Sequence, residues 1–290
     1  MSLKIGASAI ARVFAPTFYR FIAMFVCPLF SGSSGNATYV SSGSTRILVD
    51  CGGSCRAVER ELQKLDVTLD SIDCILVTHA HSDHVKGLEI VSKRYHIPIY
   101  GSIGTWQELM RSYKIPSVKK ENIRVFRTSG AQKTLDLGDL QATFFSTPHD
   151  ALDSVGYVID DGAAKFGFAT DLGRVSPGVR QNMTGCDVVL LEANYDLKML
   201  QNGPYPYPLK ERIRGAYGHL SNDDSGKFAA DLVQSGVKTL YLGHLSEHNN
   251  TIDLAYRTVC AQMQTEGVNP KSDCQIFMTR RHEASRALTF

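Results

Sequence analysis

The sequence lacks the paired cysteines of a structural zinc finger or of a disulfide framework. Its seven cysteines, at positions 27, 51, 55, 74, 186, 260 and 274, form no CxxC motif, and the shortest spacing is Cys51 to Cys55. An odd number of scattered cysteines is typical of reduced thiols in a cytoplasm. We therefore expect a cytoplasmic protein in which these side chains serve as small, buried apolar residues.

The sequence also has no long apolar run and no large excess of charge. The uncharged stretch 21–45 becomes rich in serine and glycine after Phe30, which leaves about ten apolar residues where a membrane-spanning helix needs ~20. The net charge is only +2, so the overall charge does not indicate a polyanionic partner. We expect no stable membrane association. A basic strip can be read as a nucleic-acid contact or as a solvated face: Arg111, Lys114, Lys119, Lys120, Arg124, Arg127 and Lys133.

Acidic residues are absent from residues 1–49, and the apolar residues between 10 and 25 recur at helical spacing, interrupted by Pro16. Such a leader is typical of a transit peptide or of a helix on a membrane surface. An upstream start codon, with Met24 as the natural beginning, explains it equally well. We therefore divide the chain into a leader of uncertain structure, residues 1–23, and one folded domain, residues 24–290.

Short apolar runs alternate with amphipathic patterns along the whole chain, without a proline- or glycine-rich linker, which favours a single α/β sandwich. The expected strands lie at 25–30, 37–41, 46–50, 73–77, 97–100, 122–127, 139–146, 155–160, 164–169, 188–191, 239–242 and 275–278. The expected helices lie at 54–65, 85–94, 103–112, 221–235 and 251–265. The proline-rich segment after residue 203 is expected to be a stiff loop.

A histidine-rich segment follows the apolar run 75–77 and places four potential metal ligands close together, His79, His81, Asp83 and His84. No regular helix or strand presents all four on one face, whereas a tight loop around one or two ions does so easily. The alternative is a polar turn that happens to be rich in histidine. Imidazoles with a carboxylate, and without thiolates, suit zinc, manganese or iron. The segment therefore predicts a catalytic metal site.

Three further candidate ligands, His149, Asp171 and His244, each follow the end of an expected strand. Loops at strand ends gather around active sites while the sheet holds them rigid. Any one of these residues alone is more often structural. Together with the histidine-rich segment they form a set that chance rarely assembles.

The order of these motifs resembles the metallo-β-lactamase superfamily. The resemblance implies a four-layer αββα sandwich, with no β-CASP insertion, that holds two divalent metal ions. The implied ligands are one set for each ion and a bridging carboxylate: His79, His81 and His149; Asp83, His84 and His244; and Asp171. Asp50 matches the aspartate that, in this family, orients the histidine-rich segment, here residues 79–84 and called the histidine loop below, from behind the metals.

A closer resemblance covers about residues 25–290 and rests on the segments Ser31–Asn36, Leu191–Asp196, Asn202–Leu209, Gly218–Ser221 and Leu242–His248. They are similar to the YycJ (WalJ) branch of the superfamily, which is related to ribonuclease Z and ribonuclease J. The implied activity is a 5′-to-3′ DNA exonuclease. We accordingly expect zinc or manganese as cofactor and a nucleic-acid substrate, DNA rather than RNA.

Glu192 and His219 distinguish a phosphodiesterase from other members of the superfamily. A sugar oxygen leaves phosphate poorly as an alkoxide, so a proton donor is needed. We expect a hydroxide activated by the two ions and steered by Asp83 to attack phosphorus, while His219 protonates the leaving oxygen and Glu192 orients His219. The alternative for His219 is a histidine that caps or packs near the helix expected at 221–235.

A glycine- and serine-rich loop, with Ser33, Ser34, Gly35 and Asn36, follows the first expected strand. Its backbone N–H groups can form an anion nest that holds a terminal phosphate. A simple tight turn is the competing interpretation.

Two other functions fit parts of the pattern. A glyoxalase II-type hydrolase would use the same ions on a thioester or lactone. A nucleic-acid-binding scaffold without metals is disfavoured because no ligand position is missing. The pair Glu192 and His219 favours the phosphodiester, whereas a helical substrate domain after the core would favour the thioester, and the sequence has no obvious one.

Overall fold

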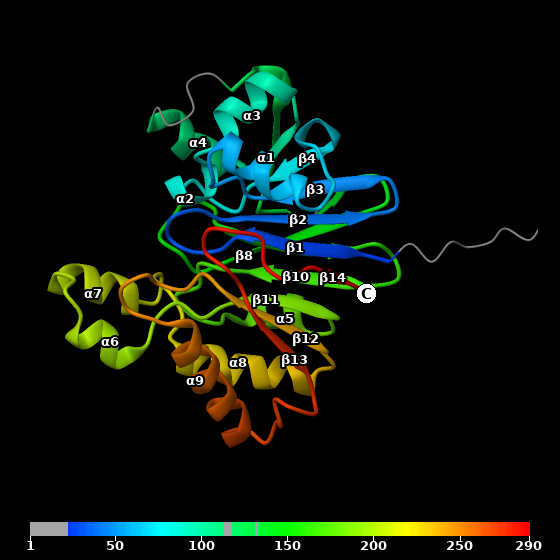
Figure 1. Cartoon of the computed structure of the whole chain (residues 1–290). Coiled ribbons are helices and arrows are strands. Elements are labelled where there is room, and N and C mark those ends of the chain that lie inside the picture. The colour runs from blue at the N-terminus through cyan, green and yellow to red at the C-terminus, as the bar shows by residue number, and fades with distance from the viewer. Residues whose placement is uncertain (1–22, 113–117, 131–132) are drawn as a thin grey trace, which may run out of the picture.

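The computed structural model describes residues 23–112, 118–130 and 133–290 (Figure 1). Apart from residue 23, the expected leader lies outside the described residues, and so does Lys114 of the basic strip. Of the strip's described members, Arg111 ends a helix and Arg124 lies in an edge strand. The role of the strip in nucleic-acid binding stays a prediction.

In the described residues, two mixed sheets of seven strands form the centre of the molecule (Figure 1). In spatial order, the first sheet consists of β14 (Leu288–Thr289), β1 (Phe25–Phe30), β2 (Ala37–Ser42), β3 (Thr45–Val49), β4 (Cys74–Leu76), β5 (Ile99–Ser102) and β6 (Ile123–Phe126). The second sheet consists of β13 (Gln275–Met278), β12 (Thr239–Gly243), β11 (Val188–Glu192), β10 (Lys165–Ala169), β9 (Val155–Asp160), β8 (Gln141–Ser146) and β7 (Thr134–Asp136). The short strands β7 and β14 were not expected from the sequence.

Helices cover the outer face of each sheet, which confirms the four-layer αββα sandwich (Figure 1). The helices are α1 (Cys55–Gln63), α2 (Ser82–Val85), α3 (Leu88–Tyr95), α4 (Ile103–Arg111), α5 (Pro177–Met183), α6 (Leu197–Asn202), α7 (Tyr207–Arg214), α8 (Asn222–Gln234) and α9 (Ile252–Thr265). α1, α3 and α4 pack on the first sheet, and α5, α8 and α9 pack on the second. Among the described helices, none has the length and apolar character needed to cross a bilayer.

Successive side chains of a strand point to opposite faces of its sheet, and this alternation explains the layers. In β3, Ile47 and Val49 belong to the core between the sheets, whereas Leu48 belongs to the core under the helices. In β12, Tyr241 faces the first sheet and Leu240 faces the helices. Because both faces of these strands are buried, each sheet contributes to two cores at once.

The helix expected at 85–94 is interrupted, and the interruption shapes the histidine loop. The chain instead forms the single turn α2, then α3 after Gly87. A continuous helix would pair the N–H of Gly87 with the carbonyl of Asp83, but that carbonyl accepts the N–H of Asn36 at 2.7 Å. Gly87 donates to the carbonyl of Cys51 at 2.8 Å instead. Hydrogen bonds to distant segments therefore end α2.

The proline-rich segment forms two short helices, α6 and α7, where a stiff loop was expected. The side chain of Asp196 caps α6 by accepting the N–H of Met199. Pro206 and Pro208 lie at the start of α7, where a missing N–H removes no helical hydrogen bond. The two helices project beside the sandwich, at the edge where the histidine loop lies (Figure 1).

A buried tyrosine connects the second sheet to the start of the histidine loop. The Tyr157 hydroxyl, on β9, donates to the carbonyl of Val77 at 2.7 Å, and the N–H of Val155 donates to the carbonyl of Thr78 at 3.1 Å. The Tyr157 side chain is fully buried, so water cannot replace this partner.

Tyr157→Phe should lower the free energy of unfolding by about 1–3 kcal/mol, because the carbonyl of Val77 is left buried without a donor. Urea unfolding followed by circular dichroism measures the effect. The control is Tyr207→Phe, which alters a tyrosine that is 74% exposed and should change stability by less than about 0.5 kcal/mol. Equal effects in the two variants would contradict the importance of the Tyr157 hydrogen bond.

Candidate metal centre

The residues expected at the site meet at one edge of the sandwich. Residues 79–84 follow β4, His149 follows β8, Asp171 follows β10, and His244 follows β12. Their potential ligand atoms fall into overlapping groups in which all atoms lie within 4.8 Å of one another. The structure therefore brings together every predicted ligand.

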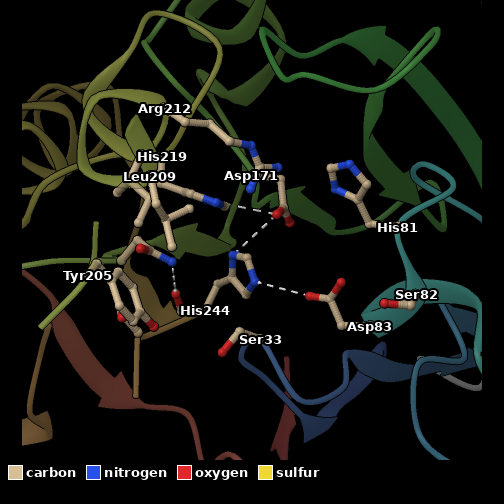
Figure 2. A pocket seen from close by; sticks show the side chains of 13 residues that line it. Ser33, His81, Ser82, Asp83, Asp171, Tyr205, Leu209, Arg212, His219 and His244 are labelled. Carbon is tan, nitrogen blue, oxygen red and sulfur yellow. Dashed lines mark hydrogen bonds and ion pairs between the residues drawn. The ribbon is translucent and has the colours of Figure 1, made fainter. Parts of the chain in front are cut away.

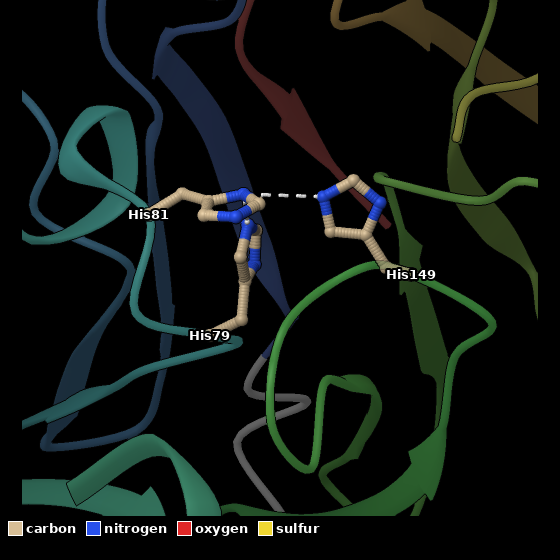
Figure 3. A group of neighbouring side chains, drawn as sticks. All are labelled: His79, His81 and His149. Atoms are coloured by element: carbon tan, nitrogen blue, oxygen red, sulfur yellow. Dashed lines mark hydrogen bonds between the residues drawn. The ribbon is translucent and has the colours of Figure 1, made fainter. Parts of the chain in front are cut away.

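The first group contains three imidazoles that point toward one another (Figure 3). His81 Nδ1 lies 3.0 Å from His79 Nε2 and 3.2 Å from His149 Nε2. His149 donates Nδ1–H to the carbonyl of Gly218 at 3.0 Å, and the Thr78 hydroxyl lies 3.0 Å from His79 Nδ1. These outer contacts fix the rings so that the inner nitrogens converge on one point.

Burial favours the neutral form of these three imidazoles. Burial lowers the pKa of His79 well below its usual value and also lowers the pKa of His81 and of His149. A neutral imidazole offers a lone pair to a metal, whereas a protonated one does not. The first group is therefore suited to bind a metal ion.

The second group contains Asp83, His84 and His244. Asp83 Oδ2 lies 3.5 Å from His84 Nε2 and 3.7 Å from His244 Nε2. Asp50 holds the far side of His84, with 2.7 Å between Oδ2 and Nδ1, and it accepts the N–H and the hydroxyl of Thr78. Burial lowers the pKa of His84, but Asp171, Asp50 and Asp83 outweigh burial and hold that pKa well above its usual value. The three carboxylates favour positive charge at this position, which a metal ion would supply in place of the proton.

Asp171 lies between the two groups. Its Oδ1 is 3.6 Å from His149 Nε2 in the first group, and its Oδ2 is 3.3 Å from His84 Nε2 in the second. Burial raises the pKa of Asp171, but His244 and His84 outweigh burial and hold it well below its usual range. One ionised carboxylate thus faces both groups.

Among the described residues, Asp171 Oδ2 and His244 Nε2 are buried and make no hydrogen bond, although each has an ion-pair contact at 3.3 Å and 3.7 Å. A buried polar atom without a partner costs about 1–3 kcal/mol unless something else satisfies it. Both atoms belong to sets of imidazole and carboxylate donors that suit divalent ions. The residues present therefore fit a divalent metal centre.

Glu192 joins the second group to His219. Its Oε1 lies 2.8 Å from His219 Nδ1 and 2.8 Å from His244 Nδ1, while Oε2 accepts the N–H groups of Leu172 and Leu220. Burial raises the pKa of Glu192, but His219 and His244 outweigh burial and lower it to about 2. The contact with His219 was expected, whereas the one with His244 was not visible in the sequence.

A cavity of about 330 Å³ opens beside these groups (Figure 2). It is lined by polar and charged side chains and by residues of α7 and its neighbouring loop: Ser33, His81, Ser82, Asp83, Asp171, Asn194, Tyr205, Leu209, Arg212, Ile213, His219, His244 and Ser246. Figure 2 shows His219, Asp171 and His244 pointing into it. The cavity gives a substrate direct access to the candidate ligands.

The glycine- and serine-rich loop lies next to the second group. Ser33 lines the cavity, and Asn36 braces the loop, with Oδ1 accepting the N–H of Gly32 at 2.9 Å. Asn36 Nδ2 also lies 3.0 Å from His84 Nε2. The loop is thus a braced turn beside the site, and binding of phosphate by Ser33, Ser34, Gly35 and Asn36 stays a prediction.

Sequence reasoning missed Asp150 and Arg212. Asp150 follows directly after His149, and its Oδ1 lies 3.4 Å from His149 Nε2. Arg212 comes from α7 and pairs with Asp150. A carboxylate next to a candidate ligand was a usable signal for Asp150, whereas no sequence pattern distinguishes Arg212 from its basic neighbours on α7.

Comparisons with known proteins agree with this geometry. The family described as a Beta-lactamase superfamily domain matches residues 45–245. Exodeoxyribonuclease YycJ from Bacillus anthracis is 34% identical over 239 residues, which are 82% of this chain and 89% of that protein. Exodeoxyribonuclease WalJ from Streptococcus pneumoniae serotype 2 (strain D39) is 32% identical over 251 residues, which are 87% of this chain and 92% of that protein.

Solved structures show the same fold. The metallo-β-lactamase fold protein YhfI from Bacillus subtilis superposes with a TM-score of 0.67 at 19% identity, covering 93% of this chain and 100% of that chain. The family match and the relatives identify a metal-dependent hydrolase. The chain belongs to the metallo-β-lactamase superfamily, in the branch that contains YycJ and WalJ.

Proposed function

We propose that this protein is a 5′-to-3′ DNA exonuclease that uses two divalent ions, zinc or manganese, and His219 as general acid. The observation that carries the proposal is the buried Glu192, whose Oε1 lies 2.8 Å from both His219 Nδ1 and His244 Nδ1. One carboxylate thereby couples a proton donor to a candidate metal ligand. The relatives named exodeoxyribonuclease support the choice of DNA as substrate.

The ions would be held by the two groups described above. His79, His81 and His149 would hold one ion, and Asp171 would bridge to the second. The second ion would take the remaining ligands, Asp83, His84 and His244. When bound, two such ions make a water more acidic and polarise the phosphate oxygens.

The side chains around the ions have separate tasks in this proposal. Asp83, at the cavity wall, orients the attacking water. His219 carries its Nδ1–H toward Glu192, which leaves Nε2–H to protonate the departing 3′-oxygen. Glu192 is ionised, with its pKa lowered to about 2 mainly by His219 against the effect of burial, so it stabilises the imidazolium before the proton moves.

The alternative is a glyoxalase II-type hydrolase of a thioester or lactone, which would use the same metal ligands. A thiolate leaves a thioester readily without a proton, so the pair of His219 and Glu192 would have no task there, whereas the alkoxide released from a lactone would need a proton. The pair therefore favours a phosphodiester over a thioester, and the direct assay separates it from a lactone.

The direct test uses single- and double-stranded DNA and RNA labelled at either end, with zinc or manganese added. We expect DNA labelled at the 5′ end to release a labelled mononucleotide at once, and DNA labelled at the 3′ end to shorten gradually. Hydrolysis of a glutathione thioester without cleavage of any nucleic acid would select the alternative function.

Asp171→Ala should abolish the cleavage and lower the metal content, because a bridging carboxylate serves both ions. Elemental analysis of the loaded variant measures the content directly. Two full equivalents of metal in Asp171→Ala would rule out the bridge.

His219→Ala should keep both metals and lower turnover on a natural phosphodiester by ~10²–10⁴-fold, the usual contribution of general acid catalysis. A p-nitrophenyl ester of thymidine 5′-phosphate has a leaving group that needs no proton, so its loss should be much smaller. His282→Ala, which alters an exposed histidine, is the control. Equal losses on the two substrates would remove the general-acid role from His219.

A further inference from the structure

Arg212 lines the cavity and carries a positive charge that does not depend on pH. The described residues that line the cavity include the carboxylates Asp83 and Asp171, several histidines, and a single arginine or lysine, Arg212. Figure 2 shows its side chain extending from α7 toward the cavity. An arginine in this place needs an explanation, because the proposed chemistry does not use it.

Asp150 holds the Arg212 guanidinium in a two-point contact. Nε lies 2.5 Å from Oδ2, and Nη2 lies 3.0 Å from Oδ1. The Arg212 side chain is 49% exposed and that of Asp150 is 31% exposed, so solvent screens the pair and it adds little to stability. The pair therefore contributes mainly by fixing the orientation of the guanidinium, and only little by stabilising the fold.

Asp150 also determines how far Arg212 lies from the metal centre. Its Oδ1 is 3.4 Å from His149 Nε2 and 3.8 Å from His81 Nε2, so the carboxylate stands between the guanidinium and the first group of ligands. The guanidinium is thus held beside the candidate ligands and not among them. Arg212 lines the cavity, so the N–H groups that do not contact Asp150 are available to an anion there.

We propose that Arg212, positioned by Asp150, binds the phosphate of the nucleic-acid chain next to the one that is cleaved. The planar guanidinium matches the oxygens of a phosphate in a two-point contact. Because Arg212 lies on α7, this helix would favour substrates that continue beyond the scissile bond over substrates with a single phosphate. The inference rests on the proposed nuclease function and adds to it a requirement for a second phosphate.

The substrate for the test is a single-stranded DNA oligonucleotide, compared with bis(p-nitrophenyl) phosphate, which has only one phosphate. On metal-loaded protein, Arg212→Met should raise KM for the oligonucleotide about tenfold, the usual effect of losing a hydrogen bond to a charged group. The effect on bis(p-nitrophenyl) phosphate should be much smaller. Arg212→Lys should be intermediate, because lysine keeps the charge but loses the two-point geometry.

Binding without turnover gives a second readout. With a chelator present, the affinity of Arg212→Met for the labelled oligonucleotide should fall less steeply with salt, by about 0.7 in the log–log slope for one lost phosphate contact. The matched control is Arg180→Met, which breaks the Arg180–Asp231 pair of similar exposure on α5 and α8. This control should keep the KM and the salt slope of the parent.

Asp150→Asn tests the positioning role. It should raise KM for the oligonucleotide, less than Arg212→Met does, and keep the metal content of the parent. Loss of metal in Asp150→Asn would make Asp150 a ligand and overturn the positioning role. An unchanged oligonucleotide KM in Arg212→Met, or equal losses on the two substrates, would overturn the assignment of Arg212. If the parent degrades no nucleic acid, the proposed function itself fails, and the inference fails with it.

Discussion

A single buried carboxylate organises this site. Glu192, at the end of β11, accepts hydrogen bonds from the backbone of Leu172 and Leu220 and lies 2.8 Å from the Nδ1 atoms of His219 and His244. It thereby links the loops that follow β10, α7 and β12. A buried carboxylate is tolerated only when its oxygens are fully paired. Here the contacts that satisfy the oxygens of Glu192 are also the contacts that hold His219 and His244 in place.

Backbone conformation contributes to the same placement. Asp50, Asp171 and His244 each lie just beyond a strand and have φ values of 63°, 58° and 54°. These left-handed conformations are unfavourable for residues other than glycine, and such strain is concentrated at functional sites. All three side chains belong to the candidate metal centre or contact one of its residues directly. The carboxylate of Asp50 and that of Asp171 then meet His84 from opposite sides.

The sequence predicted the fold, and the structure brings the candidate ligands close together as expected, because both depend on local signals. The histidine loop is contiguous, and His149, Asp171 and His244 follow recognisable strands. The break at Gly87 could not be predicted, since it depends on a hydrogen bond between Asn36 and Asp83. The pair of Arg212 and Asp150 could not be predicted either, because α7 brings together residues that are distant in the sequence.

Each group of candidate ligands combines residues from both sides of the sandwich. In the first, His79 and His81 belong to the first sheet's side of the sandwich and His149 to the second; in the second, Asp83 and His84 face His244 across the same boundary. Each ion would therefore act as a cross-link between the two halves of the protein. Ligands that bind only the folded state add RT ln(1 + [L]/Kd) to its stability. Metal supply would then set the stability of the folded protein as well as its activity.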